Sequence, residues 1–162
     1  MSDSNSEIKE LIARIEEQEH RLVFTSFDND DAWRLGTVLA ELARARKAPV
    51  ALDIRRNGQQ LFHLALPGAT ADNDAWLLRK TRTVDRYGVS SYLVGLRFAV
   101  KGTTFEESSR LDPDTYAAHG GAFPIILVGT GPVGTIAVSG LPQAEDHALV
   151  VAALEAYLVK PE

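Results

Sequence analysis

The forty residues at positions 119–158 constrain the fold of this 162-residue chain most strongly. In this part of the chain, two apolar segments flank the turn sequence Gly129-Thr130-Gly131-Pro132, and an alanine- and leucine-rich segment follows. Glycine adopts the positive φ angles that tight turns between strands require. The pattern therefore predicts two antiparallel strands, 125–128 and 133–139, and then a helix that starts near Pro142. Because strand 125–128 has no polar side chain, we expect it to be buried on both faces.

A second hairpin is predicted around Asn57-Gly58, a dipeptide typical of two-residue turns between strands. Apolar residues alternate with polar ones in the segments on either side of it, 50–55 and 60–66. A short apolar run at 22–27 predicts a further strand. Hairpins join antiparallel strands, so the chain is expected to contain an antiparallel sheet.

Several segments between and around the hairpins show helical periodicity. One of them, 31–47, carries a second stripe of small residues, which indicates close packing on two sides and favours a homo-oligomer. Segment 90–101 fits both a strand and a helix. The other predicted helices are 5–19, a helix from Thr70 or Asp72 to 85, a short turn at 113–118 and the helix after Pro142. Together the segments predict one α/β domain over residues 1–162, with helices covering both faces of the sheet.

The composition of the chain excludes several classes of function. The formal net charge of −5 argues against general nucleic-acid binding, which requires a basic surface. The chain has no cysteine, which excludes disulfides and thiolate chemistry. It has neither a signal-peptide core nor an apolar run of about 20 residues, so a cytoplasmic location and no membrane partner are expected.

His119 is the first candidate for chemistry, because Gly120 and Gly121 follow it directly. Two glycines leave the space beside a histidine open, so the ring could serve as an axial metal ligand or a proton carrier. Alternatively, His119 is an ordinary loop residue that hydrogen-bonds to the backbone.

Lys80 is the second candidate. It shares one face of its predicted helix with Trp76, Thr83 and Tyr87. Its amine could line a pocket for a carboxylate or a propionate. Alternatively, its stem packs on the aromatic rings while the amine reaches water.

Ser139 and His147 lie on either side of the start of the last helix. The spacing turns His147 toward the sheet, and the second hairpin should bring it to the same edge as His119. The acid Asp146 argues against phosphate binding at this helix start. No catalytic or nucleotide-binding motif is present, and the carboxylates and histidines do not follow a known metal signature, so we predict no metal site.

Several of these sequences resemble the haem-degrading domain family, also called GlcG-like or HbpS-like. The resemblance is carried by Gly-Gly-Ala-Phe-Pro-Ile at 120–125, Gly-Thr-Ile-Ala-Val-Ser-Gly at 134–140, Arg-Lys-Thr-Arg-Thr at 79–83 and Ser90-Ser91. The amino-acid sequence of residues 139–147 is similar to that of an uncharacterised branch of the family. The resemblance implies a profilin-like three-layer α/β/α fold with a central antiparallel sheet, a helix at 90–101 and a homo-oligomer. For some members it also implies haem binding or slow haem breakdown.

The resulting hypothesis is a cytoplasmic protein that binds a small anionic or tetrapyrrole ligand, with haem as the candidate cofactor. The predicted site comprises Lys80, His119, Gly120, Gly121 and Ser139, with His147 behind it. Two alternatives remain open. The chain could be a protein-interaction module without a small ligand, or a weak enzyme that uses His119 or His147 as a general base near Asp146.

Overall fold

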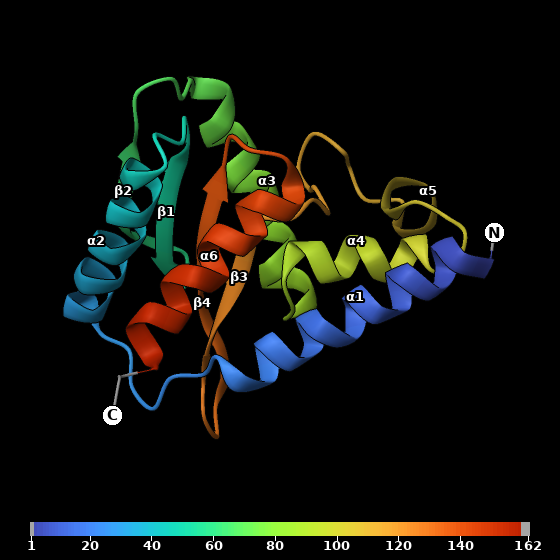
Figure 1. Cartoon of the computed structure of the whole chain (residues 1–162), viewed down its shortest axis with the longest axis horizontal. Helices are drawn as coiled ribbons and strands as arrows, with labels where there is room; N and C mark the ends of the chain where they lie inside the picture. The colour runs from blue at the N-terminus through green and yellow to red at the C-terminus, as the bar shows by residue number, and fades with distance from the viewer. Residues whose placement is uncertain (1, 160–162) are drawn as a thin grey trace.

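A four-stranded antiparallel sheet lies at the centre of the computed structural model, which describes residues 2–159 (Figure 1). The first hairpin joins β1 (Ala51–Arg56) to β2 (Gln59–Ala65), and the second joins β3 (Ala122–Leu127) to β4 (Gly131–Ser139). Because β1 also pairs with β4, the strand order is β2-β1-β4-β3. Both hairpins confirm the predictions made from their glycine turns.

Helices cover both faces of this sheet. Helices α2 (Asn29–Ala45) and α6 (Gln143–Leu158) pack on one face, and α3 (Ala71–Tyr87) packs on the other (Figure 1). The arrangement confirms the predicted three-layer α/β/α architecture. None of the helices within residues 2–159 combines the length and the apolar character needed to cross a membrane.

The two faces of the sheet differ in the size of their side chains. Large aliphatic and aromatic residues such as Leu52 and Ile136 pack toward α2 and α6, in the main core. The small side chains of Ala51, Ala122 and Ala137 face α3 and pack around Leu77 and Val84 of that helix. Small residues on this face allow α3 to approach the sheet closely, which places its polar side chains next to the ends of β3 and β4.

The small-residue stripe of α2 is used inside the chain. Gly36 leaves room for the ring of Phe62 from β2, since a Cβ atom at position 36 would lie 2.4 Å from that ring. Ala40 and Ala43 are buried in the core shared with α6. Helix α2 therefore packs closely on two sides, as predicted, and elements of the same chain provide both surfaces.

The remaining helices lie beside the β3 edge of the sheet. They are α1 (Ser2–Arg21), α4 (Ser91–Ala99) and α5 (Phe105–Ser109), and α1 runs along α4 (Figure 1). Segment 90–101, which fitted two patterns, forms helix α4. Its start is fixed by Ser90, whose hydroxyl accepts a hydrogen bond from the amide of Leu93 at 3.2 Å.

Three local predictions are wrong. Segment 22–27 forms no strand: Phe24 makes one isolated parallel bridge to Leu127, because the chain only passes the sheet between two helices. The short helix lies at Phe105–Ser109 and not at 113–118, where Asp112 accepts hydrogen bonds from Asp114 and Thr115 and fixes a turn instead. Val128 is 62% exposed in the β3–β4 turn, so the fully buried part of β3 begins earlier, at Ala122.

Candidate functional site

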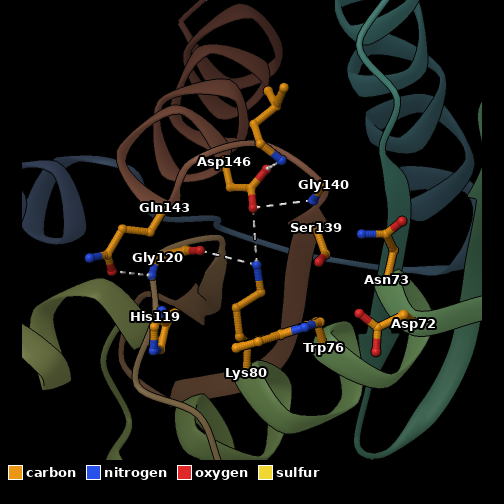
Figure 2. A pocket seen from close by; sticks show the side chains of 11 residues that line it. Asp72, Asn73, Trp76, Lys80, His119, Gly120, Ser139, Gly140, Gln143 and Asp146 are labelled. Atoms are coloured by element: carbon orange, nitrogen blue, oxygen red, sulfur yellow. Dashed lines mark hydrogen bonds and ion pairs between the residues drawn. The ribbon is translucent and has the colours of Figure 1, made fainter. Parts of the chain in front are cut away.

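A cavity of about 270 Å³ lies where the first turns of α3 approach the loop between β4 and α6 (Figure 2). Segment 119–120, just before β3, closes its third side. The lining therefore comes from three stretches that are far apart in the sequence. The lining residues are Asp72, Asn73, Trp76, Lys80, His119, Gly120, Ser139, Gly140, Leu141, Gln143 and Asp146.

Lys80 forms the base of this cavity and is only 2% exposed. Its Nζ donates hydrogen bonds to the carbonyl oxygens of Val138 at 2.6 Å and Gly120 at 3.0 Å, and pairs with Asp146 Oδ2 at 3.3 Å. An ammonium group has three N–H donors, so these contacts use all of them. Lys80 thus lines a cavity, as predicted, but its amine has no donor left for a ligand carboxylate. Nor does the amine reach water, as the alternative interpretation required.

Asp146 completes a buried ion pair with Lys80. Its carboxylate also accepts hydrogen bonds from the amides of Leu141 at 3.0 Å and Gly140 at 3.4 Å. Burial raises the pKa of the Asp146 carboxyl and lowers the pKa of the Lys80 ammonium, while the attraction between the two charges opposes both shifts. The pair joins α3, the segment before β3 and the start of α6.

The two glycines after His119 allow close approaches on either side of this ion pair. Gly121 has a φ of +133°, and a Cβ atom there would lie 2.4 Å from Lys80 Nζ. A side chain at this position would therefore displace the amine. Gly120 donates its amide to Gln143 Oε1 at 3.0 Å, which fixes the segment before β3 to the first turn of α6. The predicted glycine bend thus serves the close approach of Lys80.

His119 lies exposed at the mouth of the cavity, with its ring edge-to-face on Trp76 at a centroid distance of 5.2 Å. Its loop is held by α3, because Arg79 Nε donates to the carbonyl oxygen of Pro113 at 3.0 Å. Partial burial lowers the pKa of His119, and the positive charges of Lys80 and Arg79 lower it further against the opposing effect of Glu106. The ring is therefore neutral at pH 7, the state in which an imidazole nitrogen binds a metal ion.

His147 lies outside this cavity. It is buried between α1 and α6, where it borders a separate groove, and its Nε2 donates to Gln18 Oε1 at 2.8 Å. Tyr92 packs edge-on against its ring at 5.3 Å. Burial lowers the pKa of His147 to about 4, so the ring is neutral at pH 7. Although both histidines lie near the start of α6, they face different spaces, and His147 contacts the helix α1 instead of lining the cavity of His119.

The structure adds residues that the sequence analysis did not assign to the site. Asp72, Asn73 and Gln143 line the cavity, and Asp146 pairs with Lys80 beneath it. A spacing signal existed for Asn73, because it precedes Lys80 by seven residues and therefore lies on the same face of the predicted helix. No such signal linked Asp146 to Lys80, 66 residues earlier in the chain.

Comparison with known proteins gives this geometry a family context. The model of the HbpS-like family, described as "Haem degrading protein HbpS-like", matches residues 27–155. The chain belongs to the HbpS-like family. Within it, a UPF0303 protein of Streptomyces coelicolor is 68% identical over 147 residues, which cover 91% of this chain and 93% of the relative. A UPF0303 protein of Paraburkholderia phymatum is 52% identical over 141 residues, covering 87% of this chain and 86% of the relative.

Solved structures agree with the HbpS-like fold. The crystal structure of Ybr137w protein matches with a TM-score of 0.83 at 36% sequence identity. The match covers 90% of this chain and 86% of the Ybr137w chain. HbpS itself has a TM-score of 0.65 at 22% identity, over 85% of this chain and 93% of HbpS. A PduOC–haem complex has a TM-score of 0.68 at 17% identity, over 81% of this chain and 94% of PduOC. At these low identities, the last two show a shared fold.

Proposed function

We propose that this HbpS-like protein binds haem, and that the site is the cavity between α3 and the start of α6. The observation that carries the proposal is His119, a neutral and exposed imidazole at the mouth of a cavity with Trp76 beside it. Neutral histidine is a common axial ligand of haem iron, and an aromatic ring provides a flat surface for a porphyrin. Family membership supports the choice of haem, as does the fold shared with a protein whose haem complex is known.

The size of the cavity defines how haem would bind. Its volume of about 270 Å³ is slightly below the roughly 300–1,000 Å³ typical of sites that enclose a small molecule. A cavity of this size would enclose only part of a porphyrin. Haem would supply a redox-active iron there, and the chain would supply an imidazole at the mouth and polar groups inside.

Replacing His119 by alanine is expected to weaken haemin binding at least tenfold and to change the Soret band, because the variant lacks the iron ligand. Haemin titrations followed by absorbance, with the wild-type protein and His119→Ala side by side, test this. His20→Ala, an exposed histidine of α1, is the matched control and should bind as the wild type does. The same Soret shift in wild type and His119→Ala would remove the role of His119, and no shift in the wild type would remove haem.

We also propose that the protein forms a homo-oligomer through α2 and β2. Trp33 of α2 is 66% exposed, and its ring lies tilted by 60° against the ring of Phe62 in β2, an edge strand of the sheet. The edge of β2 offers unpaired backbone groups beside this exposed ring, and a second copy of the chain could cover both in a symmetric contact. Trp33→Glu is expected to reduce the mass measured by light scattering to that of a monomer. A monomeric wild type at micromolar concentration would contradict the proposal.

A further inference from the structure

We propose that the cavity contains a carboxylate-binding subsite formed by Ser139, Asn73 and Trp76. It is separate from His119 at the mouth and from the closed Lys80–Asp146 pair at the base. The inference rests on the proposed function only in placing the ligand in the same cavity. It assigns the acidic group of that ligand to residues other than the lysine that the sequence indicated.

Ser139 provides the main evidence. It is the last residue of β4 and only 4% exposed, yet its hydroxyl makes no hydrogen bond with any group in residues 2–159. Figure 2 shows the hydroxyl pointing into the cavity. The hydroxyl oxygen is not among the fully buried side-chain polar atoms that lack a partner, so it remains accessible from the cavity. A hydroxyl at the wall of a cavity without a partner from the chain is a hydrogen-bond donor available to a ligand.

Two further donors line the same cavity. Asn73 Oδ1 accepts a hydrogen bond from the amide of Thr70 at 2.9 Å, which fixes the side chain so that its NH2 group is the free end. In Figure 2 this nitrogen is turned toward Ser139. The indole N–H of Trp76 can only donate, and it makes no hydrogen bond among the described residues. Three donors without acceptors indicate a ligand group that accepts hydrogen bonds.

The charges around the cavity indicate a singly charged acceptor. Helices α3 and α6 both begin at this cavity, and the partial positive charge at their N-termini favours an anion. Lys80 is the only lysine or arginine in the lining, and its charge is neutralised by Asp146. The carboxylate of Asp72 also faces the cavity and repels anions. With Asp72 in the lining and Lys80 already paired, the single charge of a carboxylate is repelled less than the larger charge of a phosphate group.

A carboxylate could reach this subsite as a propionate of a tetrapyrrole or as a free small acid. The two sources are distinguished by three probes: haemin, haemin dimethyl ester and sodium succinate. If the group is a propionate, the ester should bind at least tenfold more weakly than haemin, while succinate should not bind. If it is a free acid, succinate should bind and shift the NMR signals of Ser139 and Asn73.

Three variants test the subsite with whichever probe binds. Ser139→Ala should weaken binding about tenfold, the loss expected for one hydrogen bond to a charged group. Asn73→Asp should weaken it further, because it removes a donor and adds a negative charge beside the ligand. Aspartate at position 73 keeps the oxygen that accepts from Thr70, so the fold should be retained. Asp72→Asn should strengthen binding, because it removes a negative charge. Ser108→Ala, an exposed serine of α5, is the control.

The outcomes separate this inference from haem binding itself. Ser139→Ala should keep the Soret band position that His119 determines and change only the affinity. Unchanged affinity in both Ser139→Ala and Asn73→Asp would overturn the subsite, even if haemin binds through His119. Weaker binding by Asp72→Asn would also overturn it, because that result would indicate a cationic ligand. A wild type that binds succinate but not haemin would refute the haem proposal and support the subsite, and binding of neither probe would overturn both.

Discussion

Replacing Lys80 by methionine is expected to lower the free energy of unfolding by about 3–5 kcal/mol at pH 7, the cost of removing one partner of a buried ion pair. Methionine has a similar length, so little volume is lost. The carboxylate of Asp146 would remain 3% exposed with two backbone donors and no cation. The carbonyl oxygens of Gly120 and Val138 would lose their donor as well. Urea unfolding at pH 7 measures this difference.

A second variant shows whether the uncompensated charge of Asp146 causes the loss of stability in Lys80→Met. In Lys80→Met/Asp146→Asn, the buried charge is absent, while the asparagine oxygen can still accept from the amide of Leu141. This double variant should recover part of the loss, since removal of both charges costs less than removal of one. Lys101→Met, an exposed lysine beyond α4, should change stability by less than about 0.5 kcal/mol. A loss below about 1 kcal/mol in Lys80→Met would show that the ion pair does not organise this region.

Replacing Glu19 by glutamine is expected to stabilise the protein above pH 7. The free energy of unfolding of Glu19→Gln minus that of the wild type should be about 3 kcal/mol larger above pH 7 than at pH 4. Glu19 of α1 is 8% exposed and accepts hydrogen bonds from the amide and the hydroxyl of Ser90, at 2.9 and 3.1 Å. Burial raises the pKa of its carboxyl from 4.5 to about 7, although the bonds from Ser90 oppose the shift. Glutamine can make both contacts and carries no charge at any pH.

The direction of this effect follows from the raised pKa of Glu19. The folded state holds the proton more tightly than the unfolded state, so the stabilisation is fully present below pH 4.5 and is lost as the pH rises toward 7. His147 acts in the opposite direction, because its pKa is lowered from 6.5 to about 4 and its contribution is lost as the pH falls through that range. In the wild type the two effects therefore offset each other between pH 4.5 and 6.5.

Urea unfolding of both proteins at pH 4, 5, 6, 7 and 8 measures this dependence. Relative to the wild type, Glu19→Gln should become steadily more stable as the pH rises from 5 to 7, because only the wild type loses the contribution of Glu19 over that range. Glu10→Gln, an exposed glutamate on the same helix, should follow the wild type. Parallel curves for Glu19→Gln and the wild type would contradict the raised pKa of Glu19.

Much of the fold could be predicted because its signals are local. Asn57 and Gly58 adopt positive φ angles in the first hairpin turn, as their sequence indicates. Asp28 caps α2 through a hydrogen bond from the amide of Asp31 at 2.9 Å, three residues away. Turns and helix caps depend on neighbouring residues, so they can be read from a short stretch of sequence. Segment 22–27 was predicted wrongly because a strand also requires a partner, and only Phe24 finds one.

The site depended on contacts that no local pattern contains. The sequence by itself determined the residue types: a lysine on the inner face of a helix, two glycines after a histidine, and a serine at the end of a strand. The tertiary structure decided that Lys80 pairs with Asp146, while Ser139 is left with a free hydroxyl. It also decided that His119 and His147 face different spaces. The reason is physical: a buried charge must find its partner wherever the packed elements bring one within reach, at any distance along the chain.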